Sequence, residues 1–163
     1  MPVINISYHS RERPEFDPKA LIVMGPQINV DILPPTIVEK WARSHKVQVS
    51  AIQRIPALLD SGASVTGVDT DILRKLNYPP IGVANLSTPS GTTTTNIYMV
   101  RLIIPSRADP GFPPNIPRIE IDNVRVIAVK LSNQPYKVLL GRDVLSKMVL
   151  IYNGPRALIT LGY

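Results

Sequence analysis

Two short apolar runs, each ending in a turn that contains glycine, constrain the fold of this chain most. The first run, residues 55–59, reads Ile-Pro-Ala-Leu-Leu and is followed by Asp-Ser-Gly-Ala-Ser at 60–64. It predicts a buried strand that ends by presenting the carboxylate of Asp60 on a tight turn. Gly62 and Ala63 are small enough to admit another backbone or a substrate. We interpret Asp60 as a candidate catalytic group, and a turn residue or helix cap is the alternative.

The second run, residues 138–140, reads Val-Leu-Leu and is followed by Gly141-Arg142-Asp143 and a short helical pattern. With both motifs in this order, the chain resembles the retropepsin-like aspartic proteases. That family carries an apolar-apolar-Asp-Thr/Ser-Gly-Ala motif and, later, an apolar-apolar-Gly-Arg-Asp/Asn motif before a short helix. The resemblance covers roughly residues 20–163 and implies peptide hydrolysis.

The composition indicates an all-β domain with a few short helices. Seventeen prolines and nine glycines divide the 163 residues into short pieces. A chain of this length fits one domain. We predict an N-terminal arm or loop at residues 1–19 and one domain at 20–163. The resemblance implies that this domain is a closed, acid-protease-like β-barrel, with one lobe per chain.

Turn residues and periodicity predict the individual elements. The expected strands are 20–24, 27–33, 48–59, 83–88, 93–104, 118–121, 124–129, 149–152 and 157–161, and the expected helices are 36–45 and 69–76. Thr36 and Glu39 have capping-box spacing. Trp41 is expected on the buried face of its helix, although Ile37 and Trp41 together could cover a further strand or a partner. Asp122 and Asn123 are expected to form a turn.

Peptide hydrolysis by carboxylates needs one ionised and one protonated group. The chain has a single Asp-Ser/Thr-Gly sequence and is too short for two lobes. Our hypothesis is a homodimer in which Asp60 of each subunit meets on a two-fold axis. The resemblance implies that Ser61 exchanges hydrogen bonds across that axis, and that Gly62 and Ala63 admit the substrate main chain. From the residues alone, Ser61 is a small polar turn residue.

The residues after the second run also have candidate roles. The resemblance implies that Arg142 supports the active-site loop through an ion pair; a solvated surface arginine is the alternative. Many retroviral members have an acid where this chain has Ser64. Asp69 or Asp71 could replace it, although acids at a helix start are the simpler interpretation of both. Asp143 is the alternative partner carboxylate for Asp60 within one subunit, but we expect a structural role for it in the first turn of a helix.

A hairpin around residues 89–91 corresponds in order to the family's flap, which closes over bound peptide. Its candidate substrate residues are Thr88, Pro89, Ser90, Gly91 and Thr92. An exposed turn without function is the alternative. The terminal strand at 157–162 is a candidate dimer element, because terminal strands pair between subunits in the family, and a barrel strand is the alternative.

Other chemistries are disfavoured. Cysteine is absent, which excludes disulfides, thiolate metal sites and a cysteine nucleophile. His9 and His45 have no metal-ligand spacing, and we expect neither a metal nor a cofactor. The net charge of +6 comes from scattered bases without an interleaved aromatic pattern, so specific nucleic-acid binding is not expected.

The expected partners are a peptide or protein substrate and a second copy of the chain. No apolar run approaches the ~18 residues of a membrane span. The first residues do not resemble a secretory signal, and a cytoplasmic location is favoured. Two alternative functions remain open at this point: a non-catalytic peptide-binding or assembly module on the same fold, and a basic nucleic-acid-binding barrel.

Overall fold

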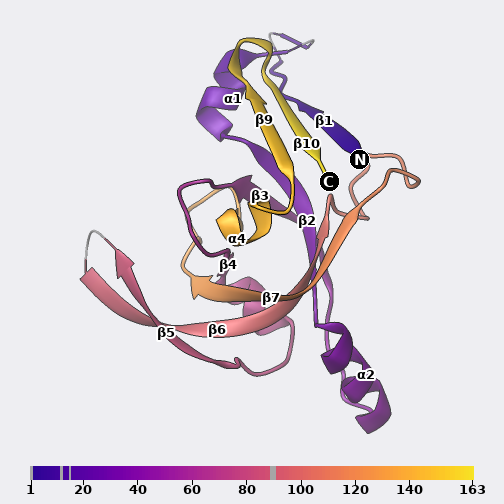
Figure 1. Ribbon diagram of the computed structural model, residues 1–163, viewed down its shortest axis with the longest axis vertical. Coiled ribbons are helices and arrows are strands. Elements are labelled where there is room, and N and C mark those ends of the chain that lie inside the picture. The colour runs from indigo at the N-terminus through magenta and orange to yellow at the C-terminus, as the bar shows by residue number, and fades with distance from the viewer. Residues whose placement is uncertain (1, 12, 15, 89–90) are drawn as a thin grey trace.

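Six strands close into a β-barrel in the computed structural model, which describes residues 2–11, 13–14, 16–88 and 91–163 (Figure 1). In order around the barrel they are β2 (Gln27–Leu33), β3 (Ile52–Leu59), β8 (Val138–Leu140), β4 (Gly67–Asp69), β7 (Ile119–Val129) and β6 (Gly91–Ile104). Pairing of β2 with β6 closes the ring. Strand β5 (Gly82–Thr88) pairs with the first residues of β6, from Gly91 to Ile97. The all-β, closed-barrel prediction is confirmed.

Alternating burial along the strands produces the core. On β3, Ile55, Ala57 and Leu59 are buried, while the residues between them are partly exposed. Side chains alternate between the two faces of a strand, so every second residue points into the barrel. The apolar run that led to the prediction of a buried strand is therefore the inner face of β3.

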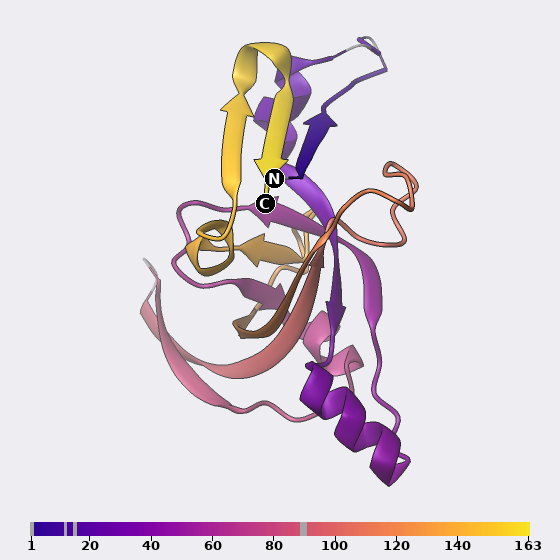
Figure 2. The ribbon, with the colours of Figure 1, turned by 45° about the vertical axis from the view of Figure 1, so that its right-hand side comes forward.

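A second, three-stranded antiparallel sheet stands beside the barrel (Figure 2). Its strands are β1 (Val3–Ser7), β10 (Leu158–Gly162) and β9 (Val149–Asn153), with β10 in the centre. Both edges of β10 are used within the chain, so a partner strand cannot pair with it. The expectation that the strand at 157–162 pairs between subunits is therefore wrong. Within residues 1–19, expected as an arm or loop, β1 is a strand because Ile4 and Ile6 pack toward the core.

Residues 20–24 were expected as a strand, but they belong to helix α1 (Pro18–Met24). The Asp17 carboxylate accepts a hydrogen bond from the Lys19 amide at 2.9 Å, and Pro18 stands in the first turn. An aspartate cap followed by proline favours a helix start. These two residues outweigh the strand preference of the apolar run that follows.

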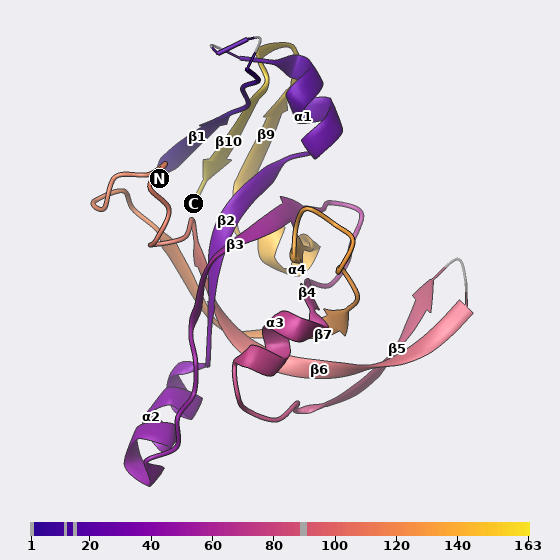
Figure 3. The same ribbon diagram turned by 180° about the vertical axis from the view of Figure 1, so that it is seen from behind.

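Helix α2 (Thr36–His45) was predicted correctly, but its contacts were not. It projects from the end of the barrel (Figure 3), and Trp41 is 52% exposed and stacks on His45, so the expected buried position of Trp41 is wrong. The expected capping box is absent. The Thr36 amide instead donates to the Asp122 carboxylate, and Glu39 binds Arg101 at 2.7 Å.

The expected turn at Asp122-Asn123 is a β-bulge. Strand β7 runs through both residues, and Asn123 has a φ of 57° where the register between β6 and β7 shifts. Asparagine tolerates this left-handed conformation better than most residues. Asn123 therefore has a conformation typical of a turn, but it lies in a bulge of a continuous strand.

Most of the remaining elements agree with the sequence, but β4 was not expected as a strand, and the strand expected at 48–59 begins at Ile52. The hairpins β5–β6 and β9–β10 form as predicted, the latter across the short 3₁₀ helix η1 (Gly154–Arg156). The last helices are α3 (Thr70–Lys75) and α4 (Arg142–Leu145). Among the described residues, none of the helices has the length and apolar character needed to span a membrane.

Candidate active site

The two sequence motifs meet at the carboxyl ends of parallel strands β3 and β8, where Leu59 pairs with Leu140. The Asp60 amide donates to the Leu140 carbonyl at 2.9 Å. Oδ1 of Asp60 accepts hydrogen bonds from the amides of Gly62 at 2.9 Å and Ala63 at 3.2 Å. Its Oδ2 has no hydrogen-bond partner among the described residues. One carboxylate oxygen is thus fixed by the loop, and the other is available to a ligand.

Arg142 holds the loop after Asp60 from the other side. Its Nη1 donates to the carbonyls of Ser61 at 2.8 Å and Gly62 at 3.2 Å, and its amide donates to the Ala63 carbonyl at 2.9 Å. The ion pairs formed by described residues do not include Arg142. The expected support of the loop is present, but the expected ion pair is wrong, because the carbonyls of the loop accept the guanidinium's hydrogen bonds.

Asp69 and Asp71 do not replace the missing acid. Asp69 caps α3 by accepting from the Asp71 amide at 3.0 Å, and it accepts from the Leu131 amide at 2.8 Å. Asp71 forms an exposed ion pair with Arg74 at 3.2 Å. Both are therefore helix-start acids, which was the simpler interpretation.

Thr66 and Asp143 connect the far end of the active-site loop to α4. The Thr66 hydroxyl donates to Asp143 Oδ1 at 2.8 Å and accepts from the Gly141 amide at 3.1 Å. The Thr66 amide donates to Asp143 Oδ2 at 3.1 Å. Both oxygens of Asp143 are thus engaged in structure. Thr66 is fully buried. The sequence did not predict a role for it, because the only indication was a threonine between Val65 and Gly67.

A cavity of about 450 Å³ opens beside the active-site loop. The loop from Gly62 to Val65 forms one wall, and Ala84, Asn85 and Leu86 of β5 form another. The rest of the lining is Gly67, Thr95, Ile127, Val129 and Leu139. No charged side chain lines the cavity in the described part of the chain, which suits an uncharged, mainly apolar ligand group. The sequence had predicted the loop wall but not the wall from β5.

The hairpin residues are described in part. Thr88 pairs with Gly91, and Thr92 pairs with Ser87, at the end of the β5–β6 hairpin. Gly91 has a φ of 129°, a conformation that favours glycine. Pro89 and Ser90 lie outside the described residues. Ser61 is exposed, and its carbonyl is held by Arg142.

In sequence comparison, no family model and no curated protein matches the chain. In structural comparison, the chain is similar to a retropepsin-like aspartic protease from Rickettsia conorii. The TM-score is 0.53 at 16% identity, covering 99% of this chain and 92% of that one. The fold is retropepsin-like. The chain also matches the simian foamy virus (mac) protease, with a TM-score of 0.40 and 16% identity over 74% of this chain and 91% of that one.

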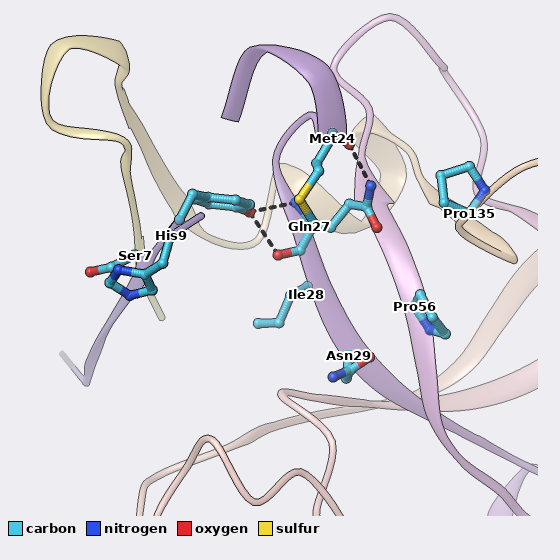
Figure 4. A pocket seen from close by; sticks show the side chains of 9 residues that line it. Ser7, His9, Met24, Gln27, Ile28, Asn29, Pro56 and Pro135 are labelled. Atoms are coloured by element: carbon cyan, nitrogen blue, oxygen red, sulfur yellow. Dashed lines mark hydrogen bonds between the residues drawn. The ribbon is translucent and has the colours of Figure 1, made fainter. Parts of the chain in front are cut away.

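The chain has a second cavity, of about 480 Å³, between β1, the end of α1, β2 and β3 (Figure 4). Met24, Ile28, Pro56 and Pro135 contribute to its lining. The Tyr8 hydroxyl donates to the Gln27 carbonyl at 2.8 Å and accepts from the Gln27 amide at 2.6 Å. None of the candidate site residues lines this cavity, whereas Gly62 and Ala63 line the cavity beside the active-site loop. We therefore assign the candidate site to the cavity beside that loop, although its volume is slightly smaller.

The described part of the chain contains no cluster of three or more histidines, aspartates or glutamates arranged to hold a metal ion. The acidic groups of the site, Asp60 and Asp143, are engaged by backbone amides and by Thr66. What the site offers chemically is a carboxylate with one oxygen fixed and one available, next to an apolar cavity.

Proposed function

We propose that this protein is an aspartic endopeptidase whose catalytic pair forms when two copies of the chain associate. The main support is the environment of Asp60. Two loop amides fix one oxygen of its carboxylate, the other oxygen is available, and an apolar cavity adjoins the loop. A retropepsin-like fold with one such carboxylate per chain is half of a two-carboxylate site.

The proposed chemistry follows from pairing two Asp60 side chains. Carboxyl groups about 3 Å apart cannot both be ionised, so they share one proton. The ionised Asp60 takes a proton from water, and the water oxygen attacks the peptide carbonyl carbon. The protonated Asp60 gives its proton to the carbonyl oxygen. The Asp60 that took the proton from water then gives it to the amide nitrogen, and the other Asp60 takes a proton from a hydroxyl of the gem-diol. The carbon–nitrogen bond breaks, which releases the amine and the carboxylic acid.

The other residues position these groups in the proposal. Arg142 holds the carbonyls of Ser61 and Gly62, which keeps the loop in shape, and Ser61 braces the pair across the two-fold axis. Thr66 and Asp143 fix the loop to α4. The β5–β6 hairpin, with residues 88–92 at its end, closes over the peptide and excludes water.

The cavity beside the loop receives a side chain of the substrate in this proposal. Its lining of Ala63, Val65, Leu86, Ile127 and Val129 carries no charge, so it favours an apolar side chain next to the cleaved bond. Burying a charged side chain there without a partner would be costly.

The test is digestion of a peptide library by the wild type and by the Asp60→Asn variant, with products identified by mass spectrometry. We expect bell-shaped pH dependence in the wild type and a loss of at least about 100-fold in the variant, the usual contribution of a positioned acid or base. Cleavage retained by Asp60→Asn contradicts the proposal. A dimeric wild type that cleaves nothing would favour the non-catalytic peptide-binding module instead.

A further inference from the structure

The second cavity, between β1, the end of α1, β2 and β3, contains polar side chains that the proposed function does not use. Gln27 and Asn29 line it from β2, and Pro56, which is opposite Asn29 on the neighbouring strand, lines it from β3. These residues alternate with the buried residues Ile28 and Ala57, so their side chains point away from the core of the barrel. The cavity is therefore separate from the one beside the active-site loop.

The side-chain amides of Gln27 and Asn29 are fixed with their oxygens available. Gln27 Nε2 donates to the Met24 carbonyl, and Asn29 Nδ2 donates to Asp109 Oδ2 at 2.6 Å. Neither Gln27 Oε1 nor Asn29 Oδ1 accepts a hydrogen bond from the described residues. Because the nitrogen of each amide is held, the orientation of its oxygen is held too. The cavity thus offers two acceptors to a ligand that carries hydrogen-bond donors.

The spacing of these two acceptors matches an extended peptide. Residues two apart on a strand have their side chains on the same face, about 6.6 Å apart, because a strand rises roughly 3.3 Å per residue. The backbone N–H groups along one edge of an extended peptide recur with the same period. A peptide that lies along β2 can therefore donate one N–H group to each amide.

The walls of the cavity differ on the two sides of these amides. In Figure 4, Ser7 and His9 lie on one side of Gln27, and Pro56 and Pro135 lie on the other. When the N–H edge of an extended peptide faces the amides, its successive side chains point to alternate walls. One wall suits small polar side chains, and the proline wall suits apolar ones. None of the described lining residues is an aspartate, glutamate, lysine or arginine, so a charged side chain would lose hydration there without gaining an ionic partner.

We propose that this cavity is a second peptide site, which binds an uncharged, extended segment that alternates small polar and apolar side chains. The binding itself does not require cleavage at Asp60. In the proposed endopeptidase the segment belongs to a protein substrate, away from the cleaved bond, and that role rests on the proposed function. Gln27 pairs with Leu58, two residues before Asp60, so β3 connects the second site to the active-site loop.

The experiment titrates isotope-labelled protein with the peptide acetyl-Ser-Val-Ser-Val-Ser-amide and follows the amide signals of the protein by NMR. All proteins carry Asp60→Asn, so that the peptide stays intact. We expect saturable shifts of the side-chain amide signals of Gln27 and Asn29. The same peptide with every amide nitrogen methylated has no N–H donors and should shift neither signal.

Removal of one acceptor tests the assignment of the site. Gln27→Met keeps the length of the side chain and removes the amide. The dissociation constant read from the Asn29 signals should therefore rise about fivefold, the effect of one net hydrogen bond. Gln53→Met makes the same change at an exposed position of β3 that does not line the cavity, and it should leave the constant unchanged. Amide spectra that are otherwise unchanged show that both variants fold.

The outcomes separate the second site from the proposed function. Shifts confined to Gly62 and Ala63 would place the peptide only beside the active-site loop and would overturn the second site. Three other results would also overturn it: no saturable shift, equal binding of the methylated peptide, or a Gln27→Met protein that binds as tightly as its parent. Cleavage of the peptide by Asp60→Asn protein overturns the proposed function, and the shifts at Gln27 and Asn29 still decide the second site.

Discussion

Single residues determine the geometry of the active-site loop, and Thr66 holds the end of that loop through its hydroxyl and its amide. Its hydroxyl and amide connect Gly141 and Asp143 to the end of the loop, in a buried position. Removing a buried hydrogen-bonding group leaves its partners unsatisfied, which costs more than the bond itself contributes.

We therefore expect Thr66→Val to lower the free energy of unfolding by about 1–3 kcal/mol, because the Gly141 amide loses its acceptor and Asp143 loses a donor. Peptide cleavage should fall as the loop loosens. Thr66→Ser, which keeps the hydroxyl, should retain cleavage. Urea denaturation and a peptide cleavage assay check both. A Thr66→Val protein with unchanged stability and cleavage would contradict this role.

At this scale the sequence predicted positions better than partners. The positions of Asp60 and Arg142 at the active-site loop were predictable because each stands in a local motif. The predicted partner of Arg142 was wrong, because the guanidinium donates hydrogen bonds to loop carbonyls and not to an acid. The pairing of Thr66 with Asp143 was missed because it joins residues 77 positions apart, and no local pattern records such a bond.

At the scale of elements, strand β8 and helix α4 approach the active-site loop very closely at Gly141. A β-carbon placed there would lie 2.6 Å from the backbone carbon of Val65 and 2.9 Å from the Thr66 amide nitrogen. Both neighbours are backbone atoms, which cannot rotate away as a side chain does. Glycine is required here by proximity.

We expect Gly141→Ala to destabilise the protein by about 1–3 kcal/mol, the usual cost of overpacking, and to displace the loop that carries Asp60. Gly82→Ala is the matched control, because a β-carbon at Gly82 meets nothing within 4 Å and should change stability by less than about 0.5 kcal/mol. Thermal unfolding of both variants tests the difference. Equal effects at the two glycines would contradict the close approach.

The end of β1 is tied to β2 by the Tyr8 hydroxyl, which bridges the amide and carbonyl of Gln27. Burial raises the pKa of Tyr8 from 10.0 to about 12. As pH rises above 10, the unfolded chain loses this proton before the folded chain does. The stability that the protonated phenol contributes is complete below about pH 10 and is lost as pH rises toward 12.

Tyr8→Phe should be less stable than the wild type at neutral pH by about 1–3 kcal/mol, because both Gln27 groups lose their partner. The difference should shrink as pH rises from 10 toward 12, where only the wild type titrates at this position. Urea denaturation at neutral and alkaline pH measures it. A difference that does not change with pH would show that the Tyr8 phenol is not protected as its burial implies.

The elements that the sequence misassigned share a physical cause. Residues 20–24 favour a strand by composition, but the Asp17 cap and Pro18 start a helix. Asn123 has a turn conformation, yet β6 supplies a neighbouring strand, so the chain continues as a bulge. In each case one capping residue or one neighbouring strand outweighed local propensity.

At the scale of the whole molecule, the closed barrel was predictable because two motifs and the short strands point to the same fold. The three-stranded sheet was not, because β1 and β10 pair residues from opposite ends of the chain, such as Val3 with Gly162. The same sheet occupies both edges of β10.

A mixing experiment shows whether each active site contains Asp60 from two copies of the chain, as we propose. Wild type and Asp60→Asn protein are allowed to exchange subunits at equal amounts, and peptide cleavage is compared with that of the wild type alone at the same wild-type concentration. Random pairing leaves only half of the wild-type subunits with a wild-type partner, so cleavage should fall to about half. Cleavage that stays unchanged after complete exchange would show that one Asp60 acts alone and would contradict the account.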